Sequence, residues 1–291
     1  MESPPRPAEW SQYLRSDSMP AIEGLHATFV GYKYAPHIHD RMTIALVERG
    51  AAAFELDDQR HVAPAGSVFV IPAGRAHTGE SASQTGYTYR VLYLDTARLS
   101  EDLELVNKAK PIGSPDVVLN NSEFGEPLRE IHRHLTSPEE EIERHEGLLL
   151  AINGLRPLFT NDGVRQVALR GDRAVRRAMH YLEEHWNVAV PLTELAQHAG
   201  VSPFWLSRRF HAQLGLPPSV YQRQLRVDRA RAYLRRGWPL ADVATACGFY
   251  DQAHLHRHFR RMTGVTPGGY ARPAPIAAGR TSTGVIDCQR R

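Results

Sequence analysis

The sequence predicts an α+β protein, with an N-terminal β-sandwich or barrel flanked by helices and a C-terminal all-α domain that carries two helix-turn-helix units. Three observations support this prediction. Short β-branched and aromatic segments succeed one another over residues 25–95, apolar residues recur with helical spacing over 123–160, and an internal repeat begins at Leu192. The length of 291 residues is typical of two domains.

The N-terminal region contains five candidate strands separated by Gly, Pro and Asp. Turn residues occupy 48–50, 57–58 and 64–66, and regularly spaced strands with such turns indicate a small sandwich or barrel. The expected strands are 25–33, 42–48, 51–56, 66–72 and 86–94. Residues 1–20 are rich in proline, and we expect them to form a flexible arm.

Two helices are expected after the strands. Leu128, Ile131 and Leu135 share one face of the first helix, and Ser137 followed by Pro138 predicts the capped start of the second. The second helix has an apolar stripe, which comprises Leu148, Leu149, Ile152, Leu155 and Phe159. This stripe has two interpretations: the helices cover the barrel, or they form the interface of a homodimer. Both can hold at once.

The C-terminal block repeats itself with an offset of 48 residues, which becomes 49 after a glycine turn. The first copy comprises Leu192, Leu195, Ala196, Ala199, Gly200, Val201, Leu206, Arg208, Phe210, Gly215, Pro218 and Tyr221. The second comprises Leu240, Val243, Ala244, Cys247, Gly248, Phe249, Leu255, Arg257, Phe259, Gly264, Pro267 and Tyr270. Matches this dense in type and spacing indicate one structural unit used twice.

Each copy predicts a helix, a glycine turn and a second helix. Gly200 supplies a positive φ that ends the first helix, Ser202 caps the next one, and Pro203 takes its first position. In the second copy Gly248 forms the turn and Asp251 is the cap. A long helix over 217–236 should connect the two units.

Charge is divided unevenly along the chain. Residues 1–171 hold 17 Lys/Arg and 24 Asp/Glu, a net charge of −7, whereas residues 172–272 hold 15 and 7, a net charge of +8. A basic block beside an acidic one favours a polyanionic partner. We place the domains at 21–160 and 172–272, a linker at 161–171 and a disordered tail at 273–291.

Double-stranded DNA is the partner that a paired helix-turn-helix with positive charge predicts. Side chains near the start of each second helix would read bases in the major groove. The candidates in the first unit are Ser202, Phe204, Ser207, Arg208 and Arg209. Those in the second unit are Gln252, Ala253, His256, Arg257 and Arg260.

Residues 174–272 resemble the DNA-binding domain of the AraC/XylS transcription regulators. The segments LTELAQHAGVSPFWLSRRF and ACGFYDQAHLHRHFRRMTGVTPGGYAR carry the resemblance. It implies seven helices, with two reading helices in successive major grooves. Histidines stand at 254, 256 and 258 where many members have small residues, so the preferred DNA sequence cannot be transferred.

The N-terminal region resembles the cupin-type sensor domain of the same family, which implies a cupin-like β-barrel. The resemblance rests on Gly31-x5-His37-x-His39 and Gly66-x5-Pro72-x-Gly74-x2-His77. In metal-binding cupins, two such motifs supply three His and one Glu. Here the Glu position falls near Thr43 and Ile44, so the fourth ligand is absent. The expected effector-binding residues are His37, His39, His77, Tyr34, Arg41 and Tyr89, with no cofactor.

These observations favour a non-enzymatic transcription regulator controlled by a small-molecule effector in the barrel. Activation or repression cannot be read from the residues, but the family resemblance favours an activator, for which RNA polymerase is a possible partner. The alternative is a cupin metalloenzyme or metal sensor fused to a DNA-binding module, since three histidines can hold a metal with an open position. A third interpretation is a barrel that only dimerises. No secretory signal or apolar stretch long enough to span a membrane occurs, which predicts a cytoplasmic protein without membrane contact.

Overall fold

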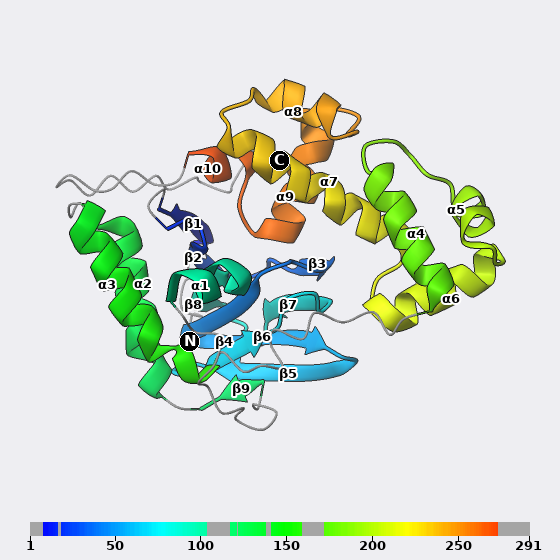
Figure 1. Ribbon diagram of the computed structural model, residues 1–291. Helices are drawn as coiled ribbons and strands as arrows, with labels where there is room; N and C mark the ends of the chain where they lie inside the picture. Colours follow the sequence, from blue (N-terminus) through cyan, green and yellow to red (C-terminus); the bar gives the residue numbers. More distant parts are fainter. Residues whose placement is uncertain are drawn as a thin grey trace.

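The computed structural model describes residues 8–16, 19–103, 117–120, 122–137, 141–158 and 172–272. The N-terminal part is a barrel-like β-domain whose antiparallel strands form two layers (Figure 1). One layer has the order β1–β2–β8–β4–β6–β9, and β3, β5 and β7 form the other layer together with the end of β4. The strands are β1 (Trp10–Arg15), β2 (Ile22–Phe29), β3 (Tyr34–His37), β4 (Met42–Leu56), β5 (Gln59–Pro64), β6 (Val68–Ile71), β7 (His77–Ser81), β8 (Tyr87–Leu94) and β9 (Val118–Leu119).

Strand β4 belongs to both layers. Its first half pairs with β6 and β8, and its second half pairs with β5 and β7. A register shift between Val47 and Arg49 bends the strand where it changes layer. The predicted break at 48–50 was therefore wrong, because partners on both sides carry the strand through Gly50. The predicted turn at Asp57 and Asp58 is confirmed, with φ of 55° and 60°.

The expectation that residues 1–20 form a flexible arm was also wrong in part. Residues 10–15 form strand β1, which pairs with β2 over its whole length. Tyr13 and Leu14 are buried there. The burial of these two side chains and the ladder of hydrogen bonds to β2 outweigh the irregular, proline-rich composition of the preceding residues. Residues 1–7 and 17–18 lie outside the described residues.

Helices cover the outer face of the first layer (Figure 1). They are α1 (Thr96–Leu103), α2 (Gly125–Thr136) and α3 (Glu141–Gly154), with short 3-10 turns at Ser122–Phe124 and Arg156–Leu158. Leu148, Ile152 and Leu155 are fully buried in one cluster with the apolar face of α2 and the sheet. The interpretation that these helices cover the barrel is thus confirmed. Phe159 lies outside the described residues.

The predicted cap at Ser137 has a different role in the structure. Ser137 follows α2 as its C-cap in an extended conformation, and its N–H approaches the carbonyl of His134. Pro138, which was expected to start the next helix, lies outside the described residues. Sequence alone could not separate these roles, because an extended Ser-Pro pair is equally suited to end one helix and to begin another.

The C-terminal domain has the seven helices that the family resemblance implies. They are α4 (Arg173–Glu184), α5 (Leu192–Ala199), α6 (Pro203–Leu214), α7 (Pro218–Arg235), α8 (Leu240–Ala246), α9 (Gln252–Thr263) and α10 (Pro267–Ala271). Helix α7 connects a unit built from α4–α6 to one built from α8–α10 (Figure 1). Gly237, with φ of 77°, follows the end of α7, as predicted.

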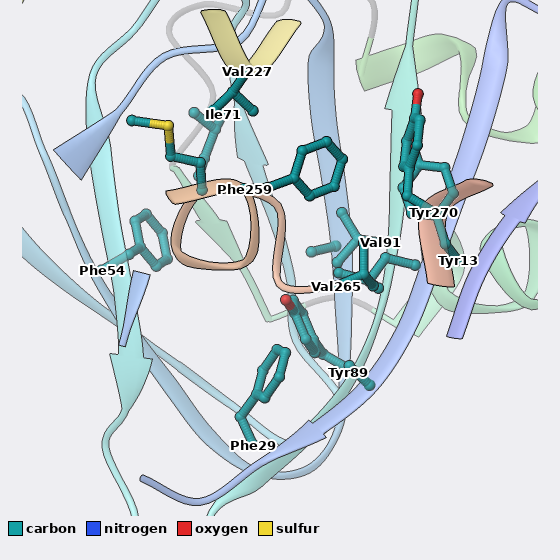
Figure 2. Close-up of a cluster of buried hydrophobic side chains, with 14 of the residues drawn as sticks. Tyr13, Phe29, Phe54, Ile71, Tyr89, Val91, Val227, Phe259, Val265 and Tyr270 are labelled. Carbon is teal, nitrogen blue, oxygen red and sulfur yellow. The ribbon is translucent and has the colours of Figure 1, made fainter. Parts of the chain in front are cut away.

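The second helix-turn-helix unit packs directly on the mouth of the barrel. One apolar cluster runs from barrel residues into the core of that unit. Figure 2 shows Phe259 and Val265 beside Tyr89 and Val91, and Tyr270 beside Tyr13. The first unit has a core of its own. The two domains therefore share part of one hydrophobic core.

The predicted linker and tail, 161–171 and 273–291, lie outside the described residues. Within the described part of the chain, no helix is long and apolar enough to cross a membrane.

Candidate functional site

The first helix-turn-helix unit has the predicted turn. Gly200 ends α5 in the left-handed conformation with φ of 77°. The Ser202 hydroxyl accepts a hydrogen bond from the Trp205 N–H at 3.2 Å, and Pro203 occupies the first turn of α6. Phe210 is fully buried in the core of the unit. The opposite face of α6 is therefore turned to solvent.

The second unit repeats this construction. Gly248 has φ of 69°, and a Cβ there would overlap the backbone carbonyl of Asn187. The Asp251 carboxylate caps α9 by accepting a hydrogen bond from the His254 N–H at 2.6 Å. Both predicted roles are confirmed. The position requires glycine for two reasons, a positive φ and a close approach of two backbones.

Helix α6 presents an aromatic and cationic surface. The Phe204 side chain is 71% exposed, and the Arg208 guanidinium lies over its ring, 5.6 Å from the centroid. Arg209, also exposed, lies 5.8 Å from the centroid of Trp205. The predicted residues Ser202 and Ser207 lie beside this surface, but the Ser202 hydroxyl is used in the cap and Ser207 is half-buried.

One side of helix α9 is exposed to solvent, and another side packs against the barrel domain. Gln252, Ala253 and Arg257 are exposed, and His256 is half-buried. Arg260, one turn further on, lies over the ring of Tyr32 in the barrel domain, 5.7 Å from its centroid. Arg260 is therefore placed in the domain interface rather than on the free face of α9.

Sequence reasoning missed one exposed aromatic residue beside α9. Tyr250 stands between the glycine turn and the Asp251 cap, and it is 92% exposed. An aromatic side chain that no core residue covers, at the start of a reading helix, is available to contact sugar or base. The signal in the sequence is the Phe249-Tyr250 pair, of which Phe249 alone is buried.

The barrel encloses a cavity of about 50 Å³ between its two layers. The three histidines and both predicted tyrosines line it together. The full lining is Tyr34, His37, His39, Thr43, Ala52, Ala53, Phe54, Phe69, Ile71, His77, Thr78, Gly79, Tyr87, Tyr89, Val91 and Tyr93. It is apolar and aromatic with a few converging polar groups, as expected of a small-molecule site.

The three histidines come from different elements and meet in this cavity. His37 ends β3, His39 follows it, and His77 begins β7. One ring nitrogen of each lies within 4.8 Å of the others. Burial lowers the pKa of each to about 3, and the neighbouring imidazole acts in the same direction. All three rings are therefore neutral at physiological pH.

Polar side chains of the cavity are linked to one another. The Tyr34 and Tyr89 hydroxyls are 2.7 Å apart, and burial raises the pKa of both phenols above their usual value. The Thr43 hydroxyl lies 3.1 Å from Nε2 of His39. Thr43, near the place where metal-binding cupins carry Glu, thus faces the histidines with a hydroxyl group.

Arg41 does not line the cavity, so its prediction as an effector-binding residue was wrong. It pairs with the buried carboxylate of Glu23 at 3.5 Å, and it donates to the Pro20 carbonyl at 3.3 Å. Arg41 follows the histidine motif closely in sequence, but the β3–β4 connection turns its side chain toward β2. Sequence proximity to a site does not determine direction in such a connection.

Glu23 connects the two domains. Its carboxylate binds Arg231 at 2.8 Å and Arg235 at 3.0 Å, both on α7, and accepts a hydrogen bond from the Tyr13 hydroxyl. Burial opposes its ionisation, yet Arg231, Arg41 and the Tyr13 hydroxyl together hold its pKa below the usual value. No pattern in the sequence indicates the Glu23–Arg231 pair, whose members are more than 200 residues apart.

The walls of the cavity also touch both helix-turn-helix units. A Cβ at Gly264, the C-cap of α9, would overlap the Tyr34 hydroxyl. Ile38, between two of the histidines, packs against the core of the first unit. Ala76, directly before the third histidine, faces Gly215 at the end of α6.

Comparison with known proteins agrees with both domains. Residues 19–152 match the model of the AraC-like ligand binding domain, and residues 195–273 match a helix-turn-helix domain. The chain belongs to the AraC family of transcription regulators. It is a regulator with an N-terminal ligand-binding domain and a C-terminal DNA-binding domain, as the sequence predicted.

Relatives in this family match most of the chain. The HTH-type transcriptional regulator YbfI of Bacillus subtilis is 24% identical over 83% of this chain and 88% of its own length. The transcriptional activator RhaS of Klebsiella pneumoniae is 26% identical over 80% and 86%. The crystal structure of ToxT from Vibrio cholerae, bound to an unsaturated fatty acid, has a TM-score of 0.54 at 13% identity over 94% of this chain and 98% of that chain, which shows a shared fold.

Proposed function

We propose that this AraC-family protein couples a small effector in the barrel cavity to the placement of its two helix-turn-helix units on DNA. One observation carries the proposal: the residues that line or flank the cavity also contact both units. Tyr34 reaches Gly264 of the second unit, and Ile38 packs on the first. A ligand that moves these side chains therefore changes the free energy of docking for each reading helix.

Control of this kind needs two arrangements with different ligand affinity. In the described arrangement, Arg260 of α9 lies over Tyr32, and the Tyr32 hydroxyl donates to the Arg260 carbonyl. Glu23 and Arg231 hold α7 to the barrel at the same time. An effector that displaces Tyr34 would weaken these contacts and change how far α9 can move relative to α6.

On DNA, we propose that the exposed side chains of α6 and α9 read bases, principally Phe204, Arg208, Gln252 and Arg257. We propose that the protein activates transcription, which is supported by the activator RhaS, a relative that aligns over most of this chain. Contact with RNA polymerase is the route that we propose for this activation. We also propose that the protein acts in the cytoplasm.

Pairing as a homodimer is also proposed, on a face different from the expected one. Leu148, Ile152 and Leu155 of the predicted stripe are buried within the chain, whereas Ile142 and Leu150 on the other side of α3 are 71% and 77% exposed. Two apolar side chains eight residues apart share one helix face, which a second copy could cover.

The cavity is better suited to a receptor than to an enzyme. Among the described residues that line it, none carries a carboxylate, and burial keeps its tyrosines protonated. The pKa of each of the three histidines is lowered to about 3, which makes them weak general bases at neutral pH. The remaining alternative hypothesis is that the barrel binds no effector and serves only for dimerisation. That hypothesis predicts that no small molecule stabilises the protein.

The test is a metabolite library screened by thermal shift with the full chain, followed by DNA affinity measurements with each ligand that binds. We expect a ligand that stabilises the protein and changes its affinity for duplex DNA at least tenfold. Ile38→Ala should keep ligand binding and lose most of the DNA response, because it removes a contact with the first unit.

Val62→Ala is the matched control, since Val62 is a half-exposed aliphatic residue on β5. It should leave both ligand binding and the DNA response unchanged. A ligand that binds the cavity without changing DNA affinity in the wild-type protein would contradict the proposed coupling. Failure of every compound to bind would favour the dimerisation-only barrel.

A further inference from the structure

The hydrogen bonds of the cavity histidines determine which ring nitrogens face one another. Nδ1 of His37 lies 2.8 Å from the Ala35 carbonyl, Nδ1 of His39 lies 2.8 Å from the Arg41 carbonyl, and Nδ1 of His77 lies 3.0 Å from the Arg75 carbonyl. A carbonyl oxygen only accepts, so each Nδ1 carries the hydrogen. In all three rings Nε2 is therefore the acceptor nitrogen, and that of His39 accepts a hydrogen bond from the Thr43 hydroxyl at 3.1 Å.

Three such lone pairs in one buried site cannot bind each other. Two imidazoles hydrogen-bond only when one donates, and here each donor hydrogen is already committed to the backbone. Their ring centroids are nevertheless only 4.2 Å (His37–His77) and 4.7 Å (His39–His77) apart. Fixing one ring nitrogen on a carbonyl while the other faces its fellows is the arrangement that orients histidines for a metal ion.

We propose that His37, His39 and His77 bind one divalent transition-metal ion through their Nε2 atoms, with a coordination position open to the tyrosine-lined part of the cavity. Three neutral imidazoles suit Zn²⁺, Fe²⁺, Co²⁺, Ni²⁺ or Cu²⁺, whereas Mg²⁺ and Ca²⁺ prefer oxygen. Sequence alone favoured no metal, because the fourth cupin ligand is missing. The hydrogen bonds from the histidine Nδ1 atoms to backbone carbonyls, which the sequence could not reveal, support the alternative that these histidines bind a metal ion.

The geometry fits such an ion after a small adjustment. A Zn–N distance of about 2.0–2.1 Å in a tetrahedral site places ligand nitrogens about 3.3 Å apart. The ring nitrogens here lie within 4.8 Å of one another, so side-chain rotations that move each by about an ångström close the site. The Thr43 hydroxyl donates a hydrogen bond to Nε2 of His39 at 3.1 Å, and an ion on that nitrogen would displace this bond. The released hydroxyl is close enough to become a further oxygen ligand or to hydrogen-bond to one.

Charge indicates the class of ligand that would complete the site. Three neutral imidazoles leave the ion with its full double charge, and no acidic side chain is among the described lining residues. A buried uncompensated charge is costly, so the open position favours an anionic oxygen donor such as a carboxylate. A second cavity of about 200 Å³ shares Tyr34, Phe54, Thr78 and Gly79 with the first and offers room for the rest of such a molecule.

Binding of a metal ion would also change contacts between the barrel and the DNA-binding domain. This part of the inference rests on the proposed function. Ile38 lies between two of the ligands and packs on the first helix-turn-helix unit. Ala76 directly precedes the third ligand and faces Gly215. Drawing the three imidazoles together would therefore move both contacts.

The test uses the full chain, stripped with a chelator and titrated with Zn²⁺ by calorimetry and with Co²⁺ by visible absorption. We expect one equivalent bound and the intense visible bands of a low-coordinate Co²⁺ site. Loss of a ligand should cost more than the 10–100-fold that loss of an outer-shell partner costs. His39→Gln and His77→Gln should therefore each weaken binding by at least a hundredfold, while their circular dichroism reports folding.

His254→Ala is the matched control, because His254 and His258 form another close histidine pair, with ring centroids 4.7 Å apart on α9. It should leave Co²⁺ binding unchanged. If the glutamine variants do not fold, Thr43→Glu replaces them, because it adds the missing carboxylate beside the histidines and should tighten Zn²⁺ binding at least tenfold.

Azide added to the Co²⁺ form should shift the visible bands, because the position facing the cavity is open. An unshifted spectrum would contradict the open position. The absence of stoichiometric Zn²⁺ or Co²⁺ binding, or its loss only in His254→Ala, would overturn the metal site. Because effector-dependent DNA binding is measured separately, failure here leaves the proposed function standing.

Discussion

Replacing Glu23 with glutamine removes one charge from the centre of the domain interface and keeps the shape of the side chain. The Glu23 side chain is 3% exposed, and its partner Arg231 is 16% exposed. Breaking a buried ion pair by removing one partner costs about 3–5 kcal/mol, since the other charge is left uncompensated.

The structure reduces that cost somewhat. Asp228 lies 3.7 Å from Arg231 and still offsets its charge, and the amide oxygen of glutamine can accept the hydrogen bond from Tyr13. Arg235 adds little, because it is 41% exposed and screened by solvent. We therefore expect Glu23→Gln to destabilise docking of the domains by about 2–4 kcal/mol.

A double-mutant cycle with Glu23→Gln and Arg231→Met, followed by urea unfolding, isolates this pair from other effects. Glu48→Gln is the matched control, because Glu48 pairs with Arg90 at 2.7 Å within the barrel domain alone. It should destabilise the barrel without coupling to Arg231. A coupling energy between Glu23 and Arg231 below about 0.5 kcal/mol, the value of an exposed pair, would refute the reasoning.

The pH dependence of the same variant has a definite sign. The pKa of Glu23 is lowered in the folded protein from 4.5. Its contribution to stability is therefore complete at neutral pH and is lost as the pH falls below 4.5 through the folded value. Burial raises the pKa of Asp228, the other partner of Arg231, to about 6. The difference in unfolding free energy between wild type and Glu23→Gln should therefore shrink over the acid range and stay constant only from about pH 7 to 8, where Asp228 is ionised.

Further predictions concern the reading helices, the second turn and α3. Arg208→Ala and Arg257→Ala should each cost roughly 1–3 kcal/mol on the preferred DNA and relax the base preference, measured by anisotropy on cognate and scrambled duplexes. Gly248→Val should destabilise the second unit by at least about 2 kcal/mol in thermal unfolding, since it adds backbone strain and an overlap with Asn187. Ile152→Glu should unfold the barrel domain in circular dichroism, because Ile152 is fully buried in the core beneath α3.

Each of these variants has a control: an exposed arginine outside the reading helices, a glycine with the same positive φ, and an exposed leucine on α3. Arg236→Ala should weaken cognate and scrambled DNA alike. Gly237→Ala shares the positive φ but meets open space, and it should cost only about 1 kcal/mol. Leu150→Glu should leave the fold intact and give a monomer in sedimentation velocity if α3 forms the dimer interface. Equal effects within a pair would contradict the corresponding assignment.

Local signals carried the successful part of the sequence prediction. A glycine turn, a Ser or Asp cap and an apolar pair at i and i+4 involve residues that contact one another within one or two helical turns. The structure confirmed these features at Gly200, Ser202, Gly248 and Asp251. The meeting of His37, His39 and His77 depended on the family resemblance, because no local pattern brings β3 and β7 together.

Most of the unsuccessful predictions depended on tertiary partners; the role of Ser137 is the exception. Strand β1 exists because β2 offers a complete ladder, and β4 continues through Gly50 because partners flank both halves. Arg41 turns away from the cavity because Glu23 attracts it. The tautomers of the histidines depend on backbone carbonyls whose direction is set only when the chain is folded.

Selection of duplexes from a random DNA library by the full-length protein tests the central claim most directly. Two reading helices on one chain predict an enriched site with two short motifs about one helical turn, 10–10.5 base pairs, apart. Affinity for that site should exceed affinity for its scrambled form by at least about a thousandfold at physiological salt. Enrichment of no motif, or equal affinity for the selected and scrambled duplexes, would contradict the assignment of α6 and α9 as sequence-reading helices.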